Sequence, residues 1–146
     1  MTHNGAAVSI RRATTHDSLD HLSQAAFSRA QVARGGRALL EQLWGSDVDS
    51  DRVRNALAAD VDAGLVWVAE DAGEIIAGVL VRDRCVRVIW VQAAHRRQRI
   101  ATALLDALLK SDDPPHDAWA LPGDRATKSL YESVGWKARL LTMRGE

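Results

Sequence analysis

The sequence predicts an α/β domain with a mixed, mostly antiparallel central sheet that is flanked by helices. Three observations lead to this fold class. Apolar residues recur with helical spacing before residue 65, they alternate with polar residues from 65 to 91, and helical spacing returns from residue 100. Separate runs of helical and strand periodicity along one chain are typical of α/β domains. The predicted order of elements is β-α-α-β-β-β-α-β-α-β.

The first expected elements are a short strand over residues 8–11 and a helix over residues 17–34. Thr14 is followed three positions later by Asp17, and this spacing predicts a capping box at the start of a helix. Apolar residues then recur at helical spacing. They are Leu19, Leu22, Ala26 and Phe27.

Two further helical stretches are expected before the chain changes to strands. The paired glycines at 35–36 end the first helix, and a second stretch carries its large apolar residues within 39–44. Asp49 or Ser50 is positioned to cap a third helix, whose apolar residues recur at intervals of four. They are Val53, Leu57 and Val61.

Residues 65–91 are expected to form three consecutive antiparallel strands. The strands cover residues 65–70, 74–82 and 85–91, and short turns separate them. The first turn ends at Gly73, and glycine adopts the positive φ of a tight hairpin turn without steric cost.

The last third of the chain is expected to alternate between helix and strand. A helix with one apolar face covers about 100–110, and a loop with two adjacent prolines follows it. A strand over 118–121 precedes a helix over 124–134. Gly135 is placed for a left-handed helix cap, and a last strand is expected over 136–143.

Length and composition are typical of one globular domain, and we expect residues 1–146 to form it, with 1–6 as a loose lead-in. The chain has 19 basic and 19 acidic residues, so its formal charge is zero. A general nucleic-acid or membrane-surface binder is usually basic, and no apolar run approaches the roughly 20 residues of a membrane span. We therefore expect neither nucleic acid nor a membrane as a partner.

The single cysteine, Cys85, excludes an intrachain disulfide and fits a reducing compartment. The start of the chain shows no signal-peptide pattern, so we expect a cytoplasmic protein, as a monomer or homodimer. No histidine or acid is paired with Cys85 in the sequence, and it is expected to be a buried free thiol. The five histidines show no metal-ligand spacing, so no metal site is predicted.

A basic turn lies between the strand that ends at Val91 and the helix that begins at Ile100. It contains Arg96, Arg97 and Arg99. The first turn of a helix has backbone N–H groups without intrahelical partners, and its dipole carries roughly +0.5 charge. A pyrophosphate would satisfy those donors, so the pattern predicts a phosphate-binding cradle. A solvated basic surface turn is the alternative.

Two segments resemble the signatures of the GNAT superfamily, the acyl-CoA-dependent N-acyltransferases. The family's coenzyme A loop has the pattern Arg/Gln-x-x-Gly-x-Gly/Ala, which Arg96 matches at the first position and Ala101 at the last. The family's later signature is Asn-x-x-Ala-x-x-(apolar)-Tyr-x-x-x-Gly-(aromatic). This chain matches it at Leu130, Tyr131, Gly135 and Trp136. The two segments occur in the family's order, and with the order of elements the resemblance covers nearly the whole chain.

The resemblance implies a GNAT-like fold and an N-acetyltransferase. Such an enzyme moves an acetyl group from acetyl-CoA to a small-molecule or peptide amine by direct attack in a ternary complex. Acetyl-CoA, and CoA as product, is the implied co-substrate, without a metal. The residues expected to contact it are Trp90, Val91, Arg96, Arg97, Gln98, Arg99, Ile100, Ala101, Thr102, Asp124 and Lys128.

Two residues receive catalytic roles through the resemblance. The backbone N–H of Val91 corresponds to the donor that stabilises the carbonyl oxygen as it gains charge. Tyr131, the only tyrosine, corresponds to the general acid that protonates the departing thiolate, because a phenol with a pKa near 10 stays protonated at neutral pH. The alternative for Tyr131 is packing of a helix against the sheet. Trp90 adjoins Val91 and is expected to wall the acceptor channel.

The chain departs from the family pattern at two positions. Arg99 stands where the coenzyme A loop has its middle glycine, and it either lies over the pyrophosphate or crowds the site. Asp124 replaces the asparagine of the later signature. A carboxylate is a good helix cap and is unfavourable beside phosphates, so capping is the preferred role for Asp124.

The sequence does not identify a general base. Glu70, Asp83 and His116 are available, but spacing selects none of them, and a chain of water molecules is an equal alternative. The missing base and Arg99 leave a second function open, a catalytically inactive acyl-CoA-binding or interaction domain of the same fold. The resemblance places the acceptor pocket at about residues 31–51 and the last strand pair, where no motif names the acceptor.

Overall fold

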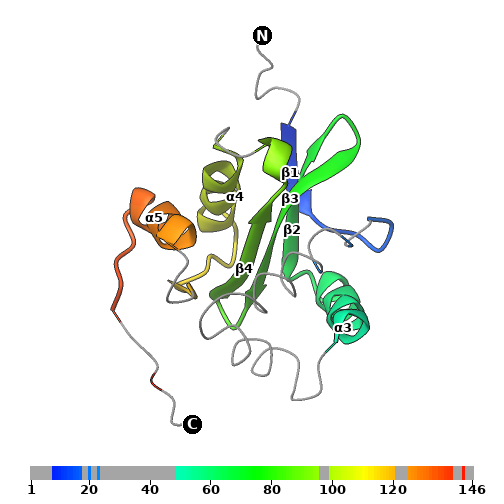
Figure 1. The fold of residues 1–146 in the computed structure, drawn as a ribbon, viewed down its shortest axis with the longest axis horizontal. Coiled ribbons are helices and arrows are strands. Elements are labelled where there is room, and N and C mark those ends of the chain that lie inside the picture. The colour runs from blue at the N-terminus through cyan, green and yellow to red at the C-terminus, as the bar shows by residue number, and fades with distance from the viewer. Residues whose placement is uncertain are drawn as a thin grey trace.

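The computed structural model describes residues 8–17, 20, 23, 49–95, 99–120, 125–139 and 143. These residues form an α/β fold in which a five-stranded sheet lies between helices (Figure 1). The expected lead-in and the helical stretch over 39–44 lie outside the described residues. Of the helix expected over 17–34, only Asp17, Asp20 and Ser23 are described, and the last two are helical.

The strands of the sheet are neighbours in the order of the chain. They are β1 (Val8–Arg12), β2 (Val66–Asp71), β3 (Glu74–Arg82), β4 (Cys85–Val91) and β5 (Asp117–Ala118). The first four strands pair antiparallel, and β5 runs parallel to β4. The predicted mixed, mostly antiparallel sheet is therefore confirmed.

Two-residue turns join β2 to β3 and β3 to β4. Ala72 and Gly73 have φ values of 53° and 86° in the first turn, and Asp83 and Arg84 have 52° and 58° in the second. Positive φ at both central residues is the type I′ geometry, whose twist matches that of the flanking strands. The second turn adopts this geometry without a glycine.

Among the described residues, three α-helices pack on the sheet, α3 (Ser50–Asp62) on one side and α4 (Ile100–Leu109) and α5 (Arg125–Ser133) on the other (Figure 1). A short 3-10 helix, Ala93–His95, follows β4. The cap predicted for the third helix is confirmed, because Asp49 Oδ1 accepts a hydrogen bond from Arg52 N–H at 2.8 Å. None of the described helices has the length and apolarity needed to span a membrane.

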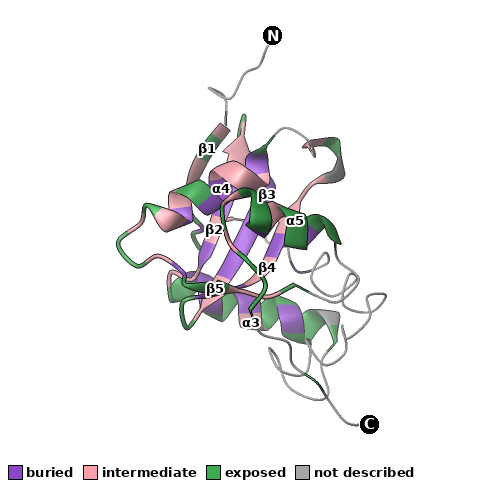
Figure 2. Ribbon diagram, turned by 90° about the vertical axis from the view of Figure 1, so that its left-hand side faces the viewer, coloured by how far each residue is buried: buried purple, intermediate pink, exposed green. Residues whose placement is uncertain are grey.

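The sheet separates two layers of apolar side chains, which we call the α3 face and the α4 face. The strands and the inner sides of the helices carry the buried residues (Figure 2). The buried residues of the α3 face are Ala13, Val53, Leu57, Val61, Val66, Val68 and Leu80. Those of the α4 face are Ala69, Ile76, Ala77, Val79, Val86, Ile89, Ile100, Leu104, Leu105, Leu108 and Tyr131.

The prediction of a last strand over 136–143 is wrong for the residues that the structure describes in this range. Residues 136–139 and 143 belong to no strand. Trp136 instead completes the end of α5, and residues 137–139, which follow it, are exposed. A segment without a buried alternating face has little apolar surface to contribute to a sheet edge.

Arg11 in β1 joins β2 to the loop after β1. Its guanidinium donates to Asp17 Oδ2 at 2.8 Å and Oδ1 at 2.9 Å, and to Glu70 Oε1 at 2.7 Å. Asp17 Oδ2 also accepts from Thr14 N–H at 2.7 Å, which is one of the two hydrogen bonds of the predicted capping box. The Arg11 hydrogen bonds hold the pKa of the Asp17 carboxyl at about 2, below its ordinary value of 3.8.

This ion pair predicts an acid-sensitive part of the stability. Because folding lowers the Asp17 pKa, its contribution is fully present above the unfolded value of 3.8 and is lost as pH falls towards about 2. We expect Asp17→Asn to reduce the free energy of unfolding at neutral pH by about 1–2 kcal/mol and to flatten its fall in that acid window. Urea unfolding across the window measures this, and equal slopes for both proteins would contradict it.

Candidate active site

Helix α4 begins where the basic turn was expected to end. Arg99 is its N-cap residue, and the Arg99 carbonyl accepts a hydrogen bond from Ala103 N–H at 3.0 Å. The N–H groups of Ile100, Ala101 and Thr102 occupy the first turn, where the helix itself offers no acceptor. Ile100 is buried in the α4 face, which fixes this helix start against the sheet. Helix starts of this kind can bind phosphate groups, and phosphate binding at this one stays a prediction.

Arg99 has a left-handed backbone, with φ 60° and ψ 23°, and its exposed side chain makes no capping hydrogen bond. Glycine adopts this conformation without steric cost, whereas a residue with a Cβ is destabilised by about 1 kcal/mol. Close approach of the backbone to a phosphate is one reason for the family's glycine. The backbone conformation gives a second reason for a glycine at this position.

The end of β4 directs Val91 N–H away from β3. Gln92 N–H donates to Ile76 O in β3 at 2.8 Å. Successive N–H groups along a strand point to opposite edges, so Val91 N–H is directed towards the side where β5 begins. An acyl carbonyl placed along this edge of β4 would meet the Val91 donor in the plane of the sheet.

Strands β4 and β5 pair near the start of β4. Among the described residues, their register covers Cys85 with Asp117 and Val86 with Ala118, and Trp119 N–H donates to Val86 O at 2.9 Å. β4 continues for five residues beyond Val86. Val91 therefore lies at the opposite end of β4 from this register.

The end of α5 has the hydrogen bonds of a Schellman motif around Gly135, which has φ 92°. Gly135 N–H donates to Glu132 O at 3.0 Å, and Trp136 N–H donates to Tyr131 O at 3.1 Å. The rings of Tyr131 and Trp136 stack with their centroids 5.9 Å apart. The predicted glycine cap is confirmed, and it positions the matched tyrosine and tryptophan against each other.

Tyr131 is 6% exposed and belongs to the buried cluster of the α4 face, together with Ile100 and Leu104. Its hydroxyl oxygen is also buried. The side chain therefore packs α5 against the start of α4 and the sheet. Packing of the helix, the alternative role for Tyr131, is thus observed, and its catalytic role stays a prediction.

Several of the expected cofactor residues are not placed by the structure. Arg96, Arg97, Gln98 and Asp124 lie outside the described residues. Lys128 lies on an exposed turn of α5, with its Nζ 4.0 Å from Glu132 Oε2, and no further contact supports or opposes a role at the phosphates.

Trp90 lies on the opposite face of the sheet from Val91. It packs with Val88 and Trp119 against the cluster of the α3 face. The Arg87 guanidinium lies over the Trp119 ring at 4.1 Å, a contact that the sequence did not predict because it depends on where β5 meets β4. Trp90 and Trp119 therefore both pack on the α3 face, and the role of Trp90 beside an acceptor stays a prediction.

The three candidate bases lie at different ends of the sheet. Asp83, in the turn before β4, is 91% exposed, and His116 N–H donates to Arg84 O at 2.7 Å. The length of β4 separates both residues from Val91, which is roughly 20 Å at 3.3 Å per residue. Glu70 instead lies one position from the cross-strand row that contains Val91.

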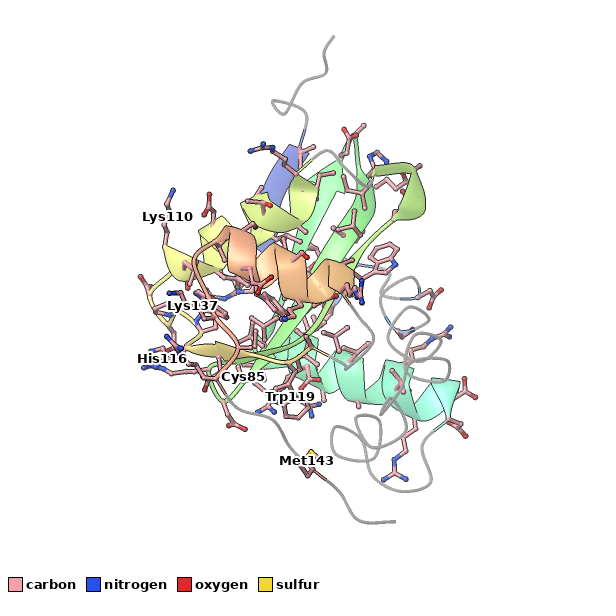
Figure 3. The ribbon with its side chains drawn as sticks, turned by 60° about the vertical axis from the view of Figure 1, so that its left-hand side comes forward. Cys85, Lys110, His116, Trp119, Lys137 and Met143 are labelled. Atoms are coloured by element: carbon pink, nitrogen blue, oxygen red, sulfur yellow. The ribbon has the colours of Figure 1, made fainter. Side chains whose placement is uncertain are left out.

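Cys85 is buried at the start of β4, and burial raises the pKa of its thiol. It lies near His116 and β5 (Figure 3). A protonated thiol is a poor nucleophile, so this environment does not favour an acetyl-cysteine intermediate. In the described ranges, no three side chains of the metal-binding types come together as a candidate metal site.

The family model for the acetyltransferase (GNAT) domain matches residues 62–138, which is more than half of the chain. This chain belongs to the GNAT family. The matched region contains β2 to β5, α4 and α5, and thus every described element of the candidate GNAT site. No curated protein matches the chain in sequence.

Solved structures share the fold at low sequence identity. yncA from Salmonella typhimurium, solved with acetyl-CoA, has a TM-score of 0.64 and 19% identity over 92% of this chain and 82% of its own. The aminoglycoside N-acetyltransferase AAC(6′)-Iy, solved with CoA, has a TM-score of 0.58 and 14% identity over 94% of both chains. An aminoglycoside acetyltransferase from an uncultured soil metagenomic sample has a TM-score of 0.56 and 18% identity over 95% and 97%. At these identities the likeness establishes the GNAT fold.

Proposed function

We propose that this GNAT domain is an N-acetyltransferase that moves an acetyl group from acetyl-CoA to an amine. One observation carries the proposal. Ile100 at the start of α4, Val91 at the end of β4 and Tyr131 in α5 all pack in or against the same apolar cluster. The residues assigned to phosphate binding, carbonyl polarisation and proton donation therefore share one apolar cluster, although 40 positions separate Val91 from Tyr131.

Each group answers one requirement of acyl transfer. The first turn of α4 holds the phosphates of the co-substrate, and Val91 N–H donates to the thioester carbonyl oxygen as the amine attacks. The Tyr131 hydroxyl gives a proton to the departing sulfur. Attack is direct, in a ternary complex, and no residue of the chain carries the acetyl group.

An amine is the acceptor class that the comparisons favour. Two of the structural neighbours are named aminoglycoside acetyltransferases, and aminoglycosides present amines. We extend only this chemistry to the present chain, so that small-molecule amines and peptide amines are both candidates. Acetyl is the proposed acyl group because the yncA structure contains acetyl-CoA.

Two measurements separate this proposal from an inactive acyl-CoA-binding domain. Calorimetric binding of acetyl-CoA is expected for both functions, and binding should raise the melting temperature as a ligand selective for the native state does. Release of CoA thiol with an amine panel is expected only for the enzyme. Binding without release would favour the inactive domain, whose support here is the non-glycine residue at position 99.

Arg99 gives opposite expectations for stability and for binding. Arg99→Gly should raise the free energy of unfolding by about 1 kcal/mol, because glycine relieves the left-handed backbone. If the guanidinium contacts the pyrophosphate, Arg99→Gly and Arg99→Ala should both weaken CoA binding by about ten-fold or more. Thermal melts and calorimetry of both variants measure these effects. Tighter binding by Arg99→Gly would show that the side chain crowds the site, and unchanged affinity would remove it from the cradle.

A further inference from the structure

Arg87 is the extra residue of a β-bulge in β4. Val86 and Val88 pair with neighbouring residues of β3, so Arg87 between them has no partner in the register. A bulge re-aims the side chain of its extra residue, and bulges are over-represented next to active sites. The Arg87 guanidinium lies 4.1 Å from the ring centroid of Trp119, which follows β5. The bulge therefore directs a positive charge to the β5 side of β4, towards which Val91 N–H is also directed.

Three contacts hold the Arg87 guanidinium in place. Its Nε donates to Arg82 O at 3.3 Å, its plane lies over Trp119, and its Nη2 is 3.5 Å from Asp83 Oδ2. The Arg87 side chain is 14% exposed, whereas that of Asp83 is 91% exposed. A strong charge-assisted hydrogen bond is about 2.7–2.9 Å long, and ion pairs with exposed partners contribute little. The charge of Arg87 is therefore mostly buried and has only a weak countercharge among the described residues.

Other arginines of the sheet and its turns bind carboxylates more closely. Arg11, Arg82 and Arg84 have a carboxylate oxygen at 2.8 Å, 2.7 Å and 2.6 Å. By contrast, Nη1 and Nη2 of Arg87 form no hydrogen bond with a described residue, and neither belongs to the buried polar atoms that lack a partner. The Nη1–Nη2 fork of Arg87 therefore reaches the surface. Such a fork matches the two oxygens of a carboxylate, and partial burial strengthens the attraction because water screens it less.

The α3 face is partly open along β4 and closed over the neighbouring strands. Val88 and Trp90 in β4 pack against the cluster of this face but keep part of their surface exposed. Val68 in β2 and Leu80 in β3 belong to the same cluster and are 0% exposed. A ligand that reaches the end of β4 from this face therefore lies along β4 and its β5 side instead of crossing the sheet. The Arg87 fork lies at the start of that surface.

We propose that Arg87 binds a carboxylate of the acceptor, so that the acceptor is an amine that also carries a carboxylate. Arg87 precedes Val91 by four residues of β4, roughly 13 Å at 3.3 Å per residue. An extended peptide of about three or four residues spans this distance, with its amine at the thioester and its C-terminal carboxylate at the guanidinium. The carboxylate replaces Asp83, the weak partner of Arg87. The inference rests on the acetyltransferase function proposed above.

Matched pairs of amines test the proposal. Glycine peptides of increasing length are offered as free acids and as C-terminal amides, and release of CoA thiol gives kcat and KM for each. At the length that spans from Val91 to Arg87, the acid should have a KM lower than that of the amide by about ten-fold or more, as expected for hydrogen bonds between charged groups. The kcat values should be similar, because the carboxylate binds equally in the ground state and the transition state.

Arg87→Gln should remove the preference for the acid and leave the amide unaffected. Glutamine keeps a polar side chain but lacks the charge and the guanidinium fork. An unchanged kcat/KM for the amide would show that the rest of the site is intact. Arg12→Gln is the matched control, because Arg12 also lies over a tryptophan, Trp67, at 4.8 Å, and its strand β1 is separated from β4 by two strands. This variant should keep the full preference for the acid.

Asp83→Asn should act in the opposite direction. It removes the carboxylate that competes for Arg87 and keeps the size of the side chain. Asparagine also tolerates the left-handed backbone of this turn position, which has φ 52°. The KM of the acid should therefore fall a further few-fold, whereas the KM of the amide should not change.

Binding measurements separate this proposal from the function on which it rests. Calorimetry of the acid and the amide in the presence of CoA reports acceptor affinity without turnover. Equal affinities at every length, or a preference that Arg87→Gln retains, would overturn the role of Arg87 and leave the acetyltransferase function standing. Absence of thiol release with every amine would remove the transferase function, and the calorimetric comparison would then decide the carboxylate site by itself. If Arg87→Gln does not fold, an unchanged affinity of Asp83→Asn for the acid would overturn the proposal.

Discussion

Tyr131→Phe is expected to lower kcat by about 10²–10⁴-fold, the usual range for general acid–base catalysis. Phenylalanine keeps the ring that stacks on Trp136 and fills the cluster under α4, and it removes only the hydroxyl. The proton is needed as the C–S bond breaks, so the loss belongs to the transition state. Acetyl-CoA affinity should therefore change little. Steady-state release of CoA thiol measures the effect.

Trp136→Phe provides the matched control for this experiment. It alters the same ring contact without touching the hydroxyl, so it should lower the melting temperature slightly and leave kcat nearly unchanged. A thioester with a more stable thiolate should also reduce the deficit of Tyr131→Phe, since a better leaving group depends less on a proton. Normal turnover by Tyr131→Phe would refute the general-acid role. A large loss of melting temperature would assign Tyr131 to packing instead.

Replacement of Val91 by its α-hydroxy acid is expected to lower kcat by about 10²–10³-fold. The resulting ester deletes one backbone N–H and keeps the side chain that packs against the α4-face cluster. This N–H is directed away from β3, because the next residue, Gln92, donates to Ile76 O. The β3–β4 ladder should therefore persist.

The same replacement at Ile89 is the control for this backbone change. Ile89 N–H points to the same edge of β4 as Val91 N–H, two residues earlier, so the ester removes an equivalent group from the same strand. Its kcat should stay within a few-fold of the unmodified protein. Equal losses at both positions would mean that the edge of β4, rather than one donor, supports activity.

Local patterns were sufficient to predict most of the described elements. The cap at Asp49, the three strands between residues 66 and 91 and the helix from Ile100 each depend on spacing within one segment. Helical and alternating periods report which side of an element is buried, and they do not depend on distant residues. The two partial signatures then predicted the family that the domain model confirms.

The register between neighbouring strands could not be predicted from one sequence. Arg11 and Glu70 are 59 positions apart, and their contact depends on how β1 aligns with β2. A bulge shifts the β2–β3 register between Ala69 and Glu70, so the position of Glu70 relative to Val91 also depends on an extra residue in β3. Spacing in the sequence alone therefore could not select the general base from its three candidates, which are Glu70, Asp83 and His116.

Two other differences arise from competition between local and tertiary effects. Tryptophan is a residue type that is common in strands. The N–H and ring of Trp136 instead complete the end of α5, and the exposed residues that follow do not extend the sheet. Arg99 was recognised as a departure from the family, whereas its left-handed backbone appears only in three dimensions. The sequence identifies a missing glycine, and the structure gives the conformation for which a glycine is favoured.

The fate of an isotopically labelled acetyl group tests the central claim most directly. Labelled acetyl-CoA is mixed with excess enzyme and the best amine of the panel, and the intact masses of protein and amine are followed through a single turnover. Direct transfer predicts that the amine gains the labelled acetyl mass as CoA thiol appears, while the protein mass never changes. A transient acetyl-protein, or thiol release without acetylated amine, would contradict the account.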